Sequence, residues 1–188
     1  IYNTFSMNKK LKIKNNASSL LPSEWIKNNL SKSNYELNLL DLACGNGRNS
    51  MYAASIGYKV TSVDINKNTL SEMQNNEFIM PIQLDLEKNN IWALQDKKFD
   101  VVLVTNYLYR PIFKNIIESM KPDGILLYET FTEENSAFGR PNNKNYLLKP
   151  QELLNFARKN KLEIINYEEI IIEKPIKKAV QRIFSILK

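Results

Sequence analysis

Short hydrophobic runs alternate along the chain with segments in which apolar residues recur every three or four positions. The runs predict strands over residues 37–42, 59–64, 79–84, 99–105, 125–129 and 162–172. The periodic segments predict a short helix that begins at residues 22–25, helices over 48–56, 67–76 and 111–120, and another that begins at Pro150. Strands that alternate with helices in this way are typical of a parallel sheet covered on both faces. We therefore expect a doubly wound α/β fold.

Residues 179–187 fit either of two structures. Val180, Ile183, Phe184 and Leu187 would share one face of a helix. The length of the segment, nine residues, also suits an edge strand, so periodicity does not decide between a helix and a strand.

The length and punctuation of the chain indicate one domain. Its 188 residues leave room for one domain of ordinary size, and the sequence contains no internal repeat and no Gly/Ser-rich linker. Residues 1–18 are polar and basic, and we expect a flexible segment there, ahead of a domain over residues 19–188. With 43% hydrophobic and 24% charged residues, the composition is that of a globular protein.

Missing residue types exclude several chemistries. The sequence has no histidine and one cysteine, Cys44. This excludes Ser-His-Asp and Cys-His triads, HExxH and cysteine-rich zinc sites and a disulfide framework, so we expect no metal. No apolar run approaches the roughly 18 residues of a membrane-spanning helix, and no signal-peptide core follows the basic start. Together with the lone cysteine, this predicts a cytoplasmic protein without membrane contact.

The formal net charge of +6 raises the question of a nucleic-acid partner. The net charge is +5 over residues 1–34, −3 over 35–148 and +4 over 149–188. The excess of positive charge thus lies at the two ends of the chain, and Lys rather than Arg supplies most of it. Such a distribution is typical of ordinary solvated surface. We therefore expect no nucleic-acid groove.

The segment that carries recognisable chemistry joins the first predicted strand to the helix over 48–56. It turns through Gly45 and Gly47 and then enters the helix. Glycines let the backbone approach a ligand closely, and free N–H groups at a helix start favour acceptor atoms. Asp64 ends the next predicted strand 19 residues after Gly45, where doubly wound folds place the acid that binds ribose hydroxyls. The pattern predicts a cofactor that contains a ribose.

The order D-x-A-x-G-x-G from Asp41 to Gly47 resembles motif I of the class I S-adenosylmethionine-dependent methyltransferases. The run 44–50 is particularly similar to that of the tellurite-resistance and related small-molecule methyltransferases. A dinucleotide fingerprint would instead need Gly or Ala in place of Ser50. Four more segments resemble later motifs of the class in the correct order, namely residues 63–65, 84–86, 100–106 and 121–126. The resemblance implies a single-domain Rossmann-like fold with a mostly parallel seven-stranded sheet, in which residues 179–187 form a strand, and S-adenosyl-L-methionine as cofactor.

A narrower resemblance extends over about residues 22–187. Residues 22–25, 106–111, 129–131 and 138–141 are similar to segments of a group of largely uncharacterised bacterial methyltransferases. The chain departs from the tellurite-resistance enzymes in its last third, where those enzymes carry His and Arg residues thought to serve the acceptor. The absence of histidine therefore argues against tellurite or selenite as substrate.

The resemblance also implies how the cofactor is held. Asp41 should order the glycine loop and face the methionyl ammonium, Asp64 should bind the ribose, and Asp85 should contact the adenine amine. Cys44 is expected to be a small packed residue beside the cofactor, because apolar surroundings raise the pKa of a thiol. The expected cofactor-binding residues are Asp41, Ala43, Cys44, Gly45, Gly47, Arg48, Asp64, Ile65, Asp85, Leu86 and Asn106.

The acceptor is expected at the carboxyl ends of the fourth and fifth predicted strands. Tyr107 and Tyr109 follow the fourth strand and would either offer aromatic faces to a sulfonium or pack in the core. Residues 131–148 connect a strand to a helix over about eighteen residues, where roughly 2–6 are usual, and we expect a lid there. Arg110 and Arg140 would either hold an anionic acceptor or form caps and ion pairs. The candidate catalytic residues are Tyr107, Tyr109, Arg110 and Arg140.

Three functions follow from these observations. The favoured one is a methyltransferase for a small-molecule acceptor, active as a monomer or homodimer, because the core leaves no separate target-recognition domain. The alternatives are an RNA or protein methyltransferase that docks its target through basic ends, and a catalytically silent S-adenosylmethionine-binding module. A general base helps only if the acceptor loses a proton during attack. Without histidine, a base would have to be Glu129, Glu133, Glu134, a tyrosine or water, so a thiolate, carboxylate or amine acceptor fits best.

Overall fold

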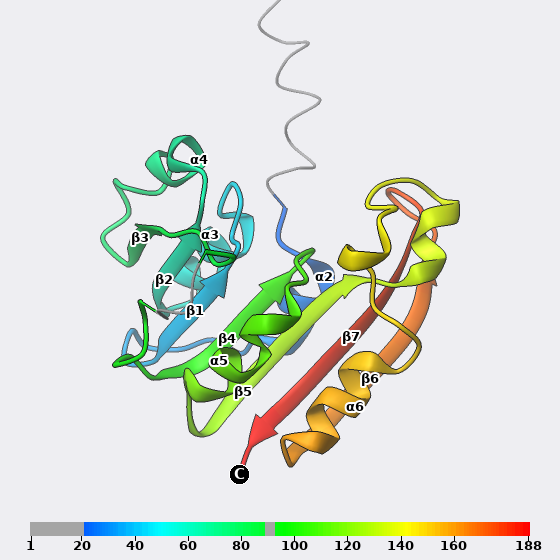
Figure 1. Ribbon diagram of the computed structural model, residues 1–188. Helices are drawn as coiled ribbons and strands as arrows, with labels where there is room; N and C mark the ends of the chain where they lie inside the picture. The colour runs from blue at the N-terminus through cyan, green and yellow to red at the C-terminus, as the bar shows by residue number, and fades with distance from the viewer. Residues whose placement is uncertain (1–20, 89–92) are drawn as a thin grey trace, which may run out of the picture.

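The computed structural model describes residues 21–88 and 93–188 and contains one seven-stranded sheet (Figure 1). The strands are β1 (Asn38–Leu42), β2 (Lys59–Asp64), β3 (Ile79–Gln83), β4 (Phe99–Thr105), β5 (Met120–Phe131), β6 (Leu162–Ile172) and β7 (Lys178–Leu187). The α-helices are α2 (Glu24–Asn29), α3 (Arg48–Ser55), α4 (Lys67–Ser71), α5 (Phe113–Glu118) and α6 (Glu152–Lys159). Short 3₁₀ helices cover Arg110–Ile112, Glu133–Ala137 and Lys144–Tyr146.

The strand order is β3-β2-β1-β4-β5-β7-β6. Strands β1 to β5 are parallel, and β7 runs antiparallel between β5 and β6. Because β2 and β4 flank β1 on opposite sides, the chain leaves the centre of the sheet in two directions. Doubly wound folds bind ligands at this point, beyond the carboxyl ends of the strands. This confirms the predicted fold class, and the antiparallel β7 makes the sheet mixed.

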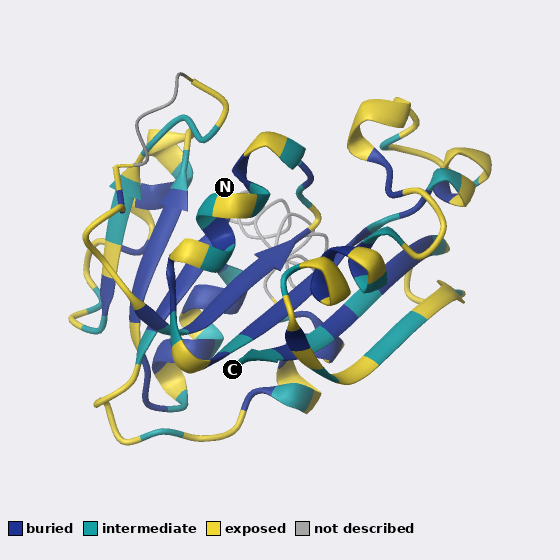
Figure 2. Cartoon of the chain, turned by 60° about the horizontal axis from the view of Figure 1, so that its bottom comes forward, coloured by how far each residue is buried: buried dark blue, intermediate teal, exposed yellow. Residues whose placement is uncertain are grey.

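Two hydrophobic clusters cover the two faces of the sheet. One packs α2, α3 and α4 against strand residues such as Leu39, Leu103 and Leu127. The other packs α5 and α6 against residues such as Leu40, Val102 and Leu126. The central strands therefore bury side chains on both faces, and Figure 2 shows most of the interior of the sheet in the dark blue of buried residues. Parallel strands of this kind need near-continuous apolar sequence, which explains the runs that marked them.

Several predicted elements differ in length from the observed ones. The helix predicted over 67–76 is shorter, since α4 ends at Ser71 and turns follow. The helix predicted over 111–120 is a 3₁₀ turn followed by α5, because Met120 already pairs with Phe99 and begins β5. The ambiguous segment is a strand, β7. The basic segment 1–18 lies outside the described residues.

The long connection after β5 is anchored at its base. Thr132 and Leu148 form a β-bridge, so the first and last residues of the connection lie side by side. Leu147 and Leu148 are buried, whereas most residues between 133 and 146 are exposed or half-buried. The connection thus projects from the carboxyl edge of the sheet as a loop with a fixed base. Among the described residues, no helix combines the length and apolar character needed to cross a bilayer.

Candidate functional site

The glycine loop between β1 and α3 has an open side. Gly45 has φ of +56°, and a Cβ added there would meet no heavy atom of the described residues within 4 Å beyond its chain neighbours. Gly47 has φ of +73° and is the N-cap of α3. Both values lie in the left-handed region that favours glycine. The open side at Gly45 leaves room for a ligand to approach the backbone.

Asp41 lies beneath this loop and is completely buried. Its Oδ2 accepts a hydrogen bond from Ser50 Oγ at 2.6 Å, and Ser62 Oγ donates to Ser50 Oγ at 2.7 Å. Its Oδ1 has no hydrogen-bond partner among the described residues. Burial raises the pKa of Asp41 to about 6, and the bond from Ser50 opposes the shift. A buried carboxylate oxygen without a partner is costly and favours the approach of a cation or donor.

Asp64 connects the end of β2 to the glycine loop. Its Oδ2 accepts from Gly45 N at 2.8 Å, and its Oδ1 accepts from Asn66 N at 2.9 Å. A carboxylate has about four lone-pair positions, so two remain for other donors such as ribose hydroxyls. The side chain is half-buried, and the adjacent Ile65 is 58% exposed. Asp64 therefore has a structural contact in addition to the predicted binding role.

The other expected cofactor residues surround the same edge of the sheet. Asp85 follows β3, and its Oδ1 accepts from Glu87 N at 3.0 Å. Ala43 and Asn106 have positive φ at the ends of β1 and β4, at 52° and 55°. Burial raises the pKa of the Cys44 thiol well above its usual range, which agrees with a packed, unreactive side chain. Of the remaining expected residues, Leu86 is half-buried, and Arg48 begins α3. The structure thus brings the ends of β1, β2, β3 and β4 together around one edge of the sheet.

The two tyrosines after β4 are tied to the core and to the loop after β3. Tyr128 Oη donates to the carbonyl of Tyr107 at 3.0 Å, and Tyr109 Oη donates to the carbonyl of Glu87 at 3.4 Å. Both Tyr107 and Tyr109 pack against the cluster beneath α5 and α6. Burial, with Glu87 and Tyr109 nearby, raises the pKa of Tyr107 above that of a free phenol. Its phenol therefore stays protonated near neutral pH.

The two arginines have different surroundings. Arg110 forms a bidentate pair with Glu152, with Nε–Oε1 at 2.6 Å and Nη2–Oε2 at 2.8 Å. It also donates to the carbonyls of Asn145 and Leu147 at 3.1 and 2.9 Å. These four bonds occupy most of the five guanidinium hydrogens, so Arg110 braces the loop before α6. Arg140 is exposed and makes no hydrogen bond or ion pair within the described part of the chain.

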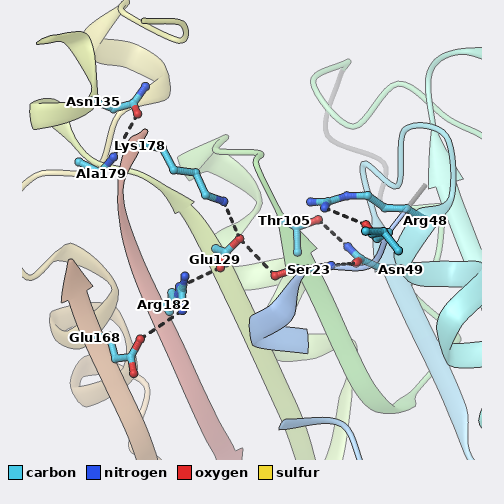
Figure 3. A network of polar contacts seen from close by, with 11 residues as sticks. Ser23, Arg48, Asn49, Thr105, Glu129, Asn135, Glu168, Lys178, Ala179 and Arg182 are labelled. Atoms are coloured by element: carbon cyan, nitrogen blue, oxygen red, sulfur yellow. Dashed lines mark hydrogen bonds and ion pairs between the residues drawn. The ribbon is translucent and has the colours of Figure 1, made fainter. Parts of the chain in front are cut away.

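A polar network that the sequence did not predict lies on the carboxyl edge beside β5 (Figure 3). Glu129 of β5 is 1% exposed and contacts Ser23, Lys178 and Arg182. Asn49, in the first turn of α3, joins Ser23 N to Thr105 Oγ1 through two hydrogen bonds of 2.9 Å. Among these residues, sequence reasoning considered only Glu129 as a reactive group, as a possible base.

The sheet order, the glycine turn and the acids at successive strand ends define the fold of the class I S-adenosylmethionine-dependent methyltransferases. The family model of the tellurite resistance protein TehB matches residues 28–128, more than half of the chain. The chain belongs to this family, which implies S-adenosyl-L-methionine as cofactor. The open side at Gly45 and the unpaired oxygen of Asp41 fit such a cofactor.

A curated relative agrees with this assignment, and solved structures share the fold. The chain is 30% identical over 120 residues to "Putative methyltransferase YqeM" of Bacillus subtilis (strain 168), a match that covers 57% of this chain and 46% of the relative. It is similar in fold to the crystal structure of TehB from Haemophilus influenzae, with a TM-score of 0.67, 23% identity and coverage of 100% of this chain and 64% of that one. A SAM-dependent methyltransferase structure from Aquifex aeolicus has a TM-score of 0.66 and 13% identity, and covers 98% of this chain and 100% of that one. The chain spans about half the length of the curated relatives that it matches.

Proposed function

We propose that this chain is an S-adenosylmethionine-dependent methyltransferase that acts on a small-molecule acceptor with little or no general-base catalysis. The observation that carries the proposal is the open side of Gly45, in a loop that follows Asp41, whose buried Oδ1 has no hydrogen-bond partner among the described residues. Together they offer a carboxylate for an ammonium and free space along the backbone. A bound S-adenosylmethionine would supply an electrophilic methyl group on a sulfonium with a good leaving group.

We assign the roles in cofactor binding to residues at successive strand ends. Asp41 would hold the methionyl ammonium, Asp64 the ribose hydroxyls through its two remaining lone-pair positions, and Asp85 the adenine amine. The open face of Gly45 would lie against the ligand. The other expected residues, Ala43, Cys44, Gly47, Arg48, Ile65, Leu86 and Asn106, would form the walls.

The acidic and aromatic side chains near the acceptor side support a reaction without a protein base. Glu129 is buried and ion-paired with two cations, and the pKa of Tyr107 is raised by burial. The oxygens of Glu129 are already engaged by Lys178 and Arg182, and a phenol with a raised pKa does not ionise readily. The chain would therefore align the acceptor and exclude water, and the acceptor would already be nucleophilic, such as a thiolate, carboxylate or amine.

Arg140 lies on the loop that we propose as a lid. From there it would attract an anionic acceptor, since its guanidinium is free of protein partners in the described part of the chain. Arg110 would instead keep the base of that loop in place. Tyr107 and Tyr109 would shape the wall after β4. We also propose a cytoplasmic enzyme that works as a monomer or homodimer.

Calorimetry followed by turnover assays tests the proposal. S-adenosylmethionine and S-adenosylhomocysteine should bind, and NAD should bind far more weakly. Release of S-adenosylhomocysteine should then accompany methylation of members of a panel of small thiols, carboxylic acids and amines. Methylation of RNA or protein fractions alone would favour the docking alternative. Binding without turnover on any acceptor would favour a silent module, and tighter binding of NAD would contradict the cofactor assignment.

A further inference from the structure

Glu129 holds three segments of the chain together at the end of β5. Its Oε1 accepts from Ser23 Oγ at 3.3 Å and lies 3.2 Å from Lys178 Nζ. Its Oε2 lies 2.9 Å from Arg182 Nε. A carboxylate that is 1% exposed is stable as an ion only with close partners of this kind. These contacts join α2 to β5 and to its neighbouring strand β7.

Ser23 departs from the usual behaviour of a helix N-cap. It occupies the N-cap position of α2, yet its side chain makes no capping hydrogen bond. A capping serine normally stabilises its helix by about 1 kcal/mol. Here the hydroxyl donates to Glu129 and the backbone N–H donates to Asn49 Oδ1. A local preference that is given up in favour of distant contacts indicates a constraint at a functional site.

Two further contacts of residues 21–25 also reach α3 and the surroundings of Glu129. Leu21 O accepts from Arg48 Nη1 at 3.2 Å, which joins the start of the segment to α3 beside the glycine loop. The ring of Trp25 lies 5.5 Å from Arg182 Cζ, over the partner of Glu129. Ser23 therefore lies between Asn49 of α3 and Glu129 of β5, as the view of the network shows (Figure 3).

We propose that Glu129 is a positioning residue that makes residues 21–25 the acceptor-side wall of the site. The inference rests on the proposed function. Through Ser23 it fixes the start of α2 at the carboxyl edge, and it pairs there with the ammonium group of Lys178, whose side chain is 24% exposed. Asn49, at the start of α3, links the glycine loop to the same segment. A cofactor that orders the glycine loop would therefore also order residues 21–25, against which the acceptor packs.

Hydrogen exchange of the α2 amides tests the contact directly. Glu129→Gln should raise the exchange rate of residues 24–30 by about tenfold or more, because a charged hydrogen-bond partner is lost. Glu168→Gln is the matched control, because Glu168 also binds Arg182, at 3.3 Å, but does not contact Ser23. It should leave α2 within about twofold of wild type.

A milder pair of variants keeps the test valid if Glu129→Gln folds poorly. Ser23→Ala should raise exchange in α2, and Ser23→Thr, which retains the hydroxyl, should restore it. The same ordering should appear in the protection that S-adenosylmethionine confers on α2. We expect that protection in wild type and a smaller protection in Ser23→Ala, which keeps the backbone bond to Asn49 but loses the hydroxyl contact with Glu129, while the dissociation constant for S-adenosylmethionine stays within about threefold. A purely structural role would change the baseline exchange but not the protection by cofactor.

The outcomes separate the two proposals. If wild type does not bind S-adenosylmethionine, the proposed function fails, while the effect of Glu129→Gln on α2 in the ligand-free protein is still measured. If wild type binds the cofactor but α2 gains no protection, the positioning role is overturned. Equal α2 exchange in wild type, Glu129→Gln and Ser23→Ala would overturn it as well.

Discussion

Alanine substitutions at the two glycines of the loop should separate stability from binding. At Gly47, φ is +73° and an added Cβ would lie inside the van der Waals contact distance of Met73 Sδ and 2.9 Å from Met73 Cγ and Cε. Met73 is flexible but only 1% exposed, so it has little room to move. At Gly45, φ is +56° but the space is open.

The magnitudes follow from these two environments. A left-handed alanine costs about 1–2 kcal/mol, and overpacking of a core typically costs about 1–3 kcal/mol. Gly47→Ala should therefore lower the free energy of unfolding by about 2–5 kcal/mol, and Gly45→Ala by about 1–2 kcal/mol. For a chain of this size each kcal/mol shifts Tm by roughly 2–4 °C, which gives drops of about 4–20 °C and about 2–8 °C.

Cofactor affinity should show the opposite order. The methyl group of Gly45→Ala would occupy the open side of the loop, so the dissociation constant for S-adenosylmethionine should rise at least about tenfold, or roughly 1.4 kcal/mol. Gly47→Ala, assayed below its Tm, should bind within a few fold of wild type because its methyl group points into the core against Met73. Thermal unfolding and titration calorimetry on the same samples measure both quantities.

A double variant tests the assigned cause. In a Met73→Ala background the clashing atoms are gone, so Gly47→Ala should cost less than in wild type, with a coupling energy of about 0.5–3 kcal/mol. Additive effects would show that Met73 is not the obstacle. Wild-type affinity in Gly45→Ala would refute the argument that the open side of the loop receives the cofactor.

Three further predictions concern charged groups. Asp64→Ala should weaken S-adenosylmethionine binding by about 1.5–3 kcal/mol in calorimetry, because the variant lacks the carboxylate that accepts from Gly45 N and that we propose as the ribose partner; affinity within twofold of wild type would leave Asp64 a purely structural residue. The pKa of Asp41 is about 6 in the folded protein against 3.8 for the free side chain, so the folded state takes up its proton first. The free energy of unfolding of the ligand-free protein should therefore fall as pH rises from about 4 to 6. Asp41→Asn should abolish this pH-dependent part of the stability. Arg140→Ala should slow turnover with little change in cofactor affinity. Arg110→Ala should instead lower the free energy of unfolding by about 1–2 kcal/mol, and Tm with it. Equal catalytic efficiency of wild type and Arg140→Ala would show that Arg140 does not act on the acceptor.

The sequence predicted the elements well where local pattern and burial agree. The strands β1, β2 and β4 lie within about one residue of their predicted ranges, because β1 and β4 are mainly apolar and β2 is rich in the β-branched residues that favour strands. The length of β5 was not predictable in this way, since its first residues contain Lys121, Pro122 and Asp123 and pair through an irregular register with β4. Resemblance, rather than periodicity, decided that residues 179–187 form a strand.

The candidate site shows the same division. Gly45, Gly47 and Asp64 could be singled out because their spacing along one βαβ unit carries the information. The partners of Glu129 could not, because Ser23 is 106 positions away and Lys178 is 49 positions away. The role of Arg110 was equally hidden, since its partner Glu152 is 42 positions away and only the fold brings the two together.

The antiparallel insertion of β7 has a consequence for how the molecule is made. Because β7 lies between β5 and β6 in the sheet but follows both along the chain, a strand made after its two neighbours occupies an interior position, and its first residues reach the carboxyl edge of the sheet. While the chain emerges from the ribosome, the edge of β5 stays unpaired and Glu129 lacks both cations until residues 178–187 arrive. A nascent or prematurely terminated chain would thus carry a complete glycine loop beside an unfinished acceptor side. Loss of residues 178–187 should be far more damaging than their distance in sequence from the glycine loop would indicate.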